Sequence, residues 1–157
     1  MQIVFEVLGE KQVNRDLLRI GEYAGDAAPA FSAIADLIME ETTEQFATEG
    51  GHASGGWAPL AESTQREKAR LGFGSRGILE RSLALEHSLT VRGDGNQILD
   101  VQPDGLDFGT SLRYGEFHQL GTSRMPQRRP VELTEDAKRR IVKVLQRWIM
   151  TGELATL

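Results

Sequence analysis

The chain has 157 residues, of which 39% are hydrophobic and 26% are charged, and its formal net charge is −5. This length suits one domain, or one domain with arms, and is enough to bury a hydrophobic core. The absence of cysteine excludes disulfides and cysteine-based metal sites. The first residues lack the pattern of a signal peptide, and no stretch reaches the ~18 apolar residues of a membrane span. We therefore expect a soluble protein, made in the cytosol, with no membrane partner.

The charge is unevenly distributed along the chain. Residues 1–49 hold 3 basic and 10 acidic side chains, whereas residues 111–157 hold 9 basic and 5 acidic ones. Two interpretations are open: a chance asymmetry among solvated faces, or an acidic end of one copy that meets the basic end of the next. Charge complementarity of the second kind sets the register and rate of association more than its affinity.

The first part of the chain predicts one strand and two helices. Residues 1–8 alternate between apolar and other side chains, as in a strand. Residues 12–24 repeat apolar residues at helical spacing, and residues 29–46, which begin at Pro29, show the clearest helical period of the chain. An acidic outer face is the usual arrangement for such a helix. The acidic residues assigned to that outer face are Asp36, Glu40, Glu41 and Glu44.

Residues 49–77 contain seven of the 17 glycines, which predicts an irregular, flexible loop with a short helix over residues 64–71. Neither the GxGxxG nor the GxxxxGK[ST] phosphate-binding pattern is present. Trp57 is expected to anchor this loop in the core, with a partner contact as the alternative. His52 is interpreted as solvated, with a catalytic role as the minor alternative.

The next residues predict a β-meander. Residues 87–92 and 97–102 are expected to pair as a hairpin around a turn at residues 93–96. After a second turn at residues 103–105, a third strand is expected at residues 106–110.

These patterns predict the α+β class: a small antiparallel sheet of about four strands packed on the long helix, with glycine-rich loops and a C-terminal helix. The chain is expected to form a single domain overall. Its α+β core spans residues 1–130 and includes the flexible loop 49–77, and a C-terminal helical arm spans residues 131–157. Thr134 is the expected N-cap of the arm's helix and Gly152 its end.

Residues 113–130 are the best candidate for a contact surface. A helical turn over residues 114–120 is followed by an arginine-rich loop between prolines. The alternative to a contact role for His118 is a core histidine that bonds a backbone carbonyl. The alternative for the arginines is a solvated loop. Trp148 is expected in the core or between subunits. The residues predicted to contact a subunit or partner are Tyr114, His118, Gln119, Arg124, Arg128 and Arg129, together with Trp57 and Trp148.

Five short motifs occur in a fixed order along the chain. They are Trp57-Ala58-Pro59-Leu60 with Thr64 and Lys68, Ile78-Leu79 with Ser82-Leu83, Ser88-Leu89-Thr90-Val91, Tyr114 to Gly121 with His118-Gln119, and Met125-Pro126-Gln127-Arg128-Arg129-Pro130. In their order and spacing the chain resembles the bacteriophage virion-morphogenesis (tail-completion, or neck) family, and in particular its Mu-like group. Two expected family features are altered: the glycine of the second motif is absent, and the last motif holds an extra arginine.

The resemblance implies a structural protein of the virion, assembled in the host bacterial cytoplasm, with no enzymatic activity, cofactor or metal. The resemblance also implies a small α+β subunit that forms a ring, often sixfold, at the head–tail junction or tail end. The implied partners are further copies of the chain and the tail-tube and head-connector proteins, and DNA is met only as it passes through the ring.

Two other functional classes are weighed against this one. The first is a nucleic-acid-binding or adaptor module that uses the basic segment 113–147, although no aromatic residue is interleaved with its basic side chains for base stacking. The second is an enzyme that uses His52 or His118, although the sequence offers no matched acid–base pair.

Overall fold

The computed structural model describes residues 10–154, and this part of the chain forms six helices and one two-stranded antiparallel sheet. The α+β class is therefore confirmed, while the strand predicted for residues 1–8 lies outside the described residues. The elements are α1 (Glu10–Gly25), α2 (Ala28–Ala47), α3 (Glu62–Arg70), α4 (Ala84–Thr90), β1 (Gln97–Gln102), β2 (Gly105–Thr110), α5 (Arg113–Leu120) and α6 (Glu135–Thr151).

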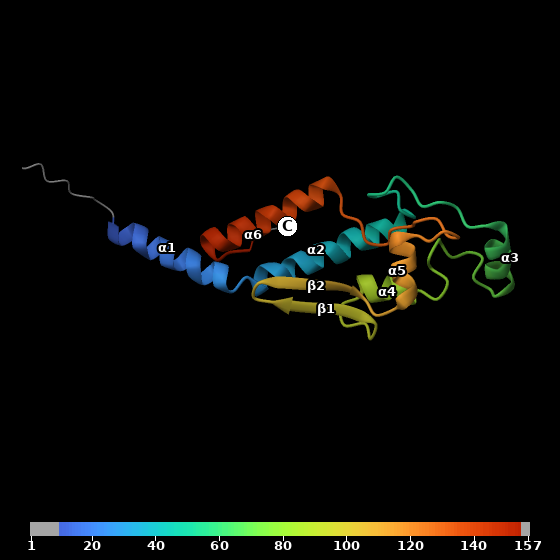
Figure 1. Cartoon of the computed structure of the whole chain (residues 1–157), viewed down its shortest axis with the longest axis horizontal. Helices are drawn as coiled ribbons and strands as arrows, with labels where there is room; N and C mark the ends of the chain where they lie inside the picture. Colours follow the sequence, from blue (N-terminus) through green and yellow to red (C-terminus); the bar gives the residue numbers. More distant parts are fainter. Residues whose placement is uncertain (1–9, 155–157) are drawn as a thin grey trace, which may run out of the picture.

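Helix α2 is the centre of the fold, with α6 along one side and the hairpin β1–β2 along another (Figure 1). Pro29 lies in its first turn, where the missing N–H breaks no helical hydrogen bond. The first half of α2 packs on α6 through Ile34 and Val144. Its last turn packs Phe46 against Trp57 and α4. The expected helix over residues 29–46 is confirmed, and the segment expected as a C-terminal arm packs along it.

The sheet is smaller than predicted. Strands β1 and β2 pair in register from Gln97↔Thr110 to Gln102↔Gly105, so the turn between them is the one expected at residues 103–105. The strand expected at residues 106–110 is thus confirmed. The prediction of about four strands is wrong for residues 10–154, which contain only these two.

The error lies in residues 87–92, predicted as a strand but folded mostly into α4. The buried side chains Leu85, Ser88 and Leu89 are spaced by three, four and one positions, so a helix places all three on one face. A strand would turn Ser88 and Leu89 to opposite sides and expose one of them. Burial against α2 and β2 therefore outweighs the local hairpin signal of residues 93–96.

The helix ends follow the expected capping residues. The Thr134 hydroxyl accepts a hydrogen bond from the amide of Ala137 and so caps α6, and Gly152 ends that helix at a φ of 71°. Gly121 likewise ends α5 at a φ of 73°. The short helices predicted near residues 12–24, 64–71 and 114–120 are confirmed as α1, α3 and α5.

The chain is elongated, with α1 at one end and α3 at the other (Figure 1). Only the C-terminal part of α1 is held by the body. There the Trp148 indole donates hydrogen bonds to the carbonyls of Tyr23 and Asp26, at 3.1 and 3.0 Å. The N-terminal part of α1 extends away from α6 and α2 (Figure 1).

Candidate functional site

Two glycine- and proline-containing loops meet at the end of α2, and Arg128 joins them. Its side chain is 5% exposed, with Nε donating to the Ala58 carbonyl at 2.7 Å and Nη2 to the Pro59 carbonyl at 2.9 Å. Burial lowers the pKa of Arg128, although a guanidinium remains charged at any physiological pH. The structure therefore places this predicted contact residue inside the protein.

Trp57 holds the same junction from the other loop. Its Nε1 donates to the Arg129 carbonyl at 3.0 Å, and its ring meets Phe46 edge to face with centroids 5.4 Å apart. Gly50 has a φ of +84°, and a side chain there would overlap the Trp57 indole. A glycine is thus required at residue 50 for two independent reasons.

Buried polar side chains complete the junction. The Gln45 amide nitrogen donates to the Ser54 hydroxyl and to the Arg129 carbonyl, and its oxygen accepts from the Ala53 amide. The Ser54 hydroxyl in turn donates to Glu132 at 2.7 Å. The acceptors and donors of Gln45 are therefore satisfied within the chain, as burial requires.

Glu41 is the second buried group that sequence reasoning placed wrongly, because it was assigned to the acidic outer face of its helix. It is 7% exposed and lies 3.1 Å from His52 Nε2 and 2.8 Å from the Thr134 hydroxyl, which donates to it. Burial acts to raise the pKa of Glu41, but the hydrogen bonds from Thr134 and His52 outweigh it, so the pKa lies below the usual value. Its spacing of seven residues from Ile34 was the available signal for the buried face.

Gln119 ties α5 to the same loop. Its amide nitrogen donates to the Val131 carbonyl at 2.9 Å, and its oxygen accepts from the Val131 amide at 3.2 Å. The Arg128 amide also donates to the His118 carbonyl at 2.9 Å. The loop 121–134 is therefore fixed to α5 on one side and to the Trp57 loop on the other.

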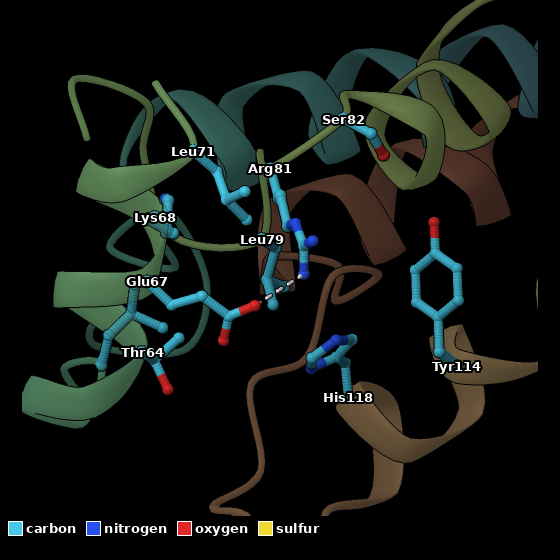
Figure 2. A pocket seen from close by; sticks show the side chains of 10 residues that line it. Thr64, Glu67, Lys68, Leu71, Leu79, Arg81, Ser82, Tyr114 and His118 are labelled. Carbon is cyan, nitrogen blue, oxygen red and sulfur yellow. Dashed lines mark ion pairs between the residues drawn. The ribbon is translucent and has the colours of Figure 1, made fainter. Parts of the chain in front are cut away.

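A groove of about 480 Å³ lies between α3 and α5, and we call it the α3–α5 groove (Figure 2). Its apolar lining comes from Leu60, Leu71, Leu79 and the ring of Tyr114. An ion pair between Glu67 and Arg81, 3.7 Å apart, lies across it (Figure 2). The lining of the groove is thus mixed, because these apolar side chains lie beside the ion pair and beside Thr64, Lys68, Ser82 and His118.

His118 forms part of the groove wall beside Tyr114, and the two rings lie edge to face with centroids 6.2 Å apart. Desolvation, followed by the nearby charge of Arg128, lowers the pKa of His118. The ring is therefore neutral at pH 7. Among the described residues, its buried Nδ1 has no hydrogen-bond partner.

The remaining predicted contact residues lie apart from the groove. Arg124 is exposed in the loop after α5, and Arg129 is also exposed, with its guanidinium 2.8 Å from Glu132. Trp148 lies near the far end of the molecule, where its ring centroid is 5.8 Å from that of Tyr23. The structure thus brings Tyr114 and His118 together in one surface and distributes the others over the junction and the opposite end.

A second surface lies on α1, and sequence reasoning did not assign it a contact role. Val13, Leu17 and Leu18 are 56%, 59% and 70% exposed, and we call these three side chains the α1 face. Large apolar side chains on an exposed, projecting helix are typical of a binding surface. The helical apolar period of residues 12–24 was the available signal.

Within residues 10–154, no three histidine, aspartate or glutamate side chains are placed to hold a metal ion. None of the helices in that range combines the length and apolar character needed to cross a bilayer.

A family model described as the phage virion morphogenesis family matches residues 8–150, nearly the whole chain. The fold and its two unlike surfaces thus belong to a bacteriophage protein of virion assembly. The chain is a member of the phage virion morphogenesis family. Searches of curated proteins and of solved structures gave no match.

Proposed function

We propose that this chain is a structural subunit that forms a ring at the head–tail junction or tail end of the virion. The observation that carries the proposal is that one elongated chain has two unlike surfaces at opposite ends: the apolar α1 face and the α3–α5 groove, in which apolar and charged side chains are mixed. A closed ring of identical subunits needs two different, complementary surfaces on each copy. Membership of a virion morphogenesis family supports this setting.

In this role the ring completes the tail and docks it to tail-tube or head-connector proteins during assembly in the host cytoplasm. DNA passes through the ring, and the subunit carries out no chemistry. Arg124, which is exposed on a loop fixed at both sides, is the predicted arginine best placed to meet such a neighbour.

The structure gives little support to the alternative of a nucleic-acid-binding module. On α6, the basic side chains Lys138, Arg139 and Arg140 lie within 4 Å of an acidic partner. Neutralised cations contribute less to phosphate binding, which depends on free positive charge. The Arg140 pair joins α6 to Glu40 of α2, so the basic and acidic parts of the sequence partly neutralise each other within one chain.

The test is the native mass in solution, measured by light scattering at several protein concentrations and at low and high salt. Because the α1 face is apolar, we expect a multimer whose mass changes little with salt. Dissociation at high salt would instead support contacts between the charged ends. A monomer under every condition would contradict self-assembly of the isolated chain.

A further inference from the structure

We infer that the α1 face of one subunit docks in the α3–α5 groove of the next. This inference rests on the proposed ring and identifies the contact that builds it. The groove takes an amphipathic helix, and its occupant is a second copy of this chain.

Apolar side chains project from α1 on its exposed surface. Val13 and Leu17 are one helical turn apart and share one face, and Leu18 lies beside them around the helix. Helices that bind in grooves present anchors one turn apart, as Val13 and Leu17 are. Among residues 10–154, the body of the same chain covers α1 near Tyr23 and leaves these anchors exposed.

The groove exposes apolar side chains on two of its walls. Leu71 and Tyr114 are 39% and 41% exposed on walls that come from different elements, α3's end and α5. The volume of about 480 Å³ is within the range of concave sites that bury a ligand's apolar groups. The groove therefore offers apolar contacts on both walls to the apolar anchors of α1.

Charged groups accompany the apolar side chains on both surfaces. An exposed Asp16–Arg19 pair flanks Leu17, and the exposed Glu67–Arg81 pair lies across the groove. Each surface thus brings one carboxylate and one guanidinium, which exchange partners when the surfaces meet.

The two surfaces lie on opposite ends of one chain. The projecting part of α1 and the groove are separated by the length of the molecule (Figure 1). They therefore do not meet within a subunit, and a contact between two such unlike surfaces joins one copy to the next and forms a ring where the rotation closes.

The test uses the absence of cysteine in the natural chain, which gives disulfide trapping a clean background. Leu17→Cys and Leu71→Cys proteins are prepared separately, mixed under mild oxidation and analysed without reductant. We expect a covalent dimer in the mixture and little in either protein alone. The matched control replaces Leu71→Cys with Val142→Cys, on a residue of α6 that is 51% exposed, and should give no dimer above background.

The outcomes separate the docking contact from the ring. A multimeric wild-type mass without the mixed disulfide would overturn the docking contact and leave the ring. A disulfide formed by Leu17→Cys alone, or equally with Val142→Cys, would also overturn it. A wild-type monomer without the mixed disulfide would contradict both.

A second variant removes the anchor without cysteine chemistry. Leu17→Asp should weaken self-association by at least about tenfold, as expected for loss of a central apolar anchor, while Val142→Asp should leave it unchanged. Both residues are exposed, so circular dichroism should show both variants folded. Equal association of the two variants would overturn the inference.

Discussion

Replacement of Arg128 by alanine should destabilise the protein more than any other single arginine change in its loop. The guanidinium makes two hydrogen bonds to loop carbonyls, at 2.7 and 2.9 Å, from a side chain that is only 5% exposed. A hydrogen bond that involves a charged group contributes about 1.5–3 kcal/mol, and truncation leaves both carbonyls without this donor. We therefore expect a loss of about 3–4 kcal/mol in the free energy of unfolding.

The assay is thermal and urea unfolding followed by circular dichroism. For a domain of this size, 1 kcal/mol corresponds to about 2–4 °C in Tm, so Arg128→Ala should lower Tm by roughly 10 °C. Arg124→Ala is the matched control on the same loop, and because Arg124 is exposed its effect should stay within about 0.5 kcal/mol. If the two variants had equal stability, the assignment of Arg128 to the loop junction would be refuted.

Three further changes test the core, the backbone and the buried carboxylate. Gly50→Ala should lower the free energy of unfolding, measured in urea, by at least about 2 kcal/mol, because its new methyl group meets the Trp57 indole. Gly55→Ala, at a φ of +72° in open space, should lower it by about 1 kcal/mol. Leu83 has a φ of 62°, so Leu83→Gly should be more stable than Leu83→Ala by about 1 kcal/mol, the reverse of the usual order; equal stability would contradict a left-handed residue there. The pKa of Glu41 is lowered by folding, so its ionised form adds stability above its unfolded pKa, near 4.5, and this stability is lost as the pH falls through the folded value. Glu41→Gln should therefore flatten the acid limb of a stability–pH curve, and an unchanged limb would show that Glu41 is not held by Thr134 and His52.

The helices could be predicted because their signals are local. Pro29 begins one helix, Thr134 caps another and Gly152 ends it, and each acts through its own backbone geometry. The strand over residues 87–92 was predicted wrongly because a strong turn signal follows it. The sequence did not predict that the residue just before α4, Leu83, has a left-handed backbone.

The junction could not be predicted, because its partners are far apart in the sequence. Glu41 meets Thr134 across 93 positions, and Arg128 meets Ala58 across 70. A charged side chain is predicted to be exposed unless its buried partner is known, so Glu41 and Arg128 were both predicted on the surface. The groove shows the same limit: Tyr114 and His118 were singled out, but their apolar neighbours in the segments around α3 and the exposed face of α1 emerge only from the fold.

Electron microscopy of the purified wild-type chain tests the central claim most directly. The account predicts closed rings with an axial opening, built from identical contacts between unlike ends of neighbouring subunits. Single subunits, or compact pairs related by a twofold axis, at concentrations where light scattering has reached its plateau would contradict it.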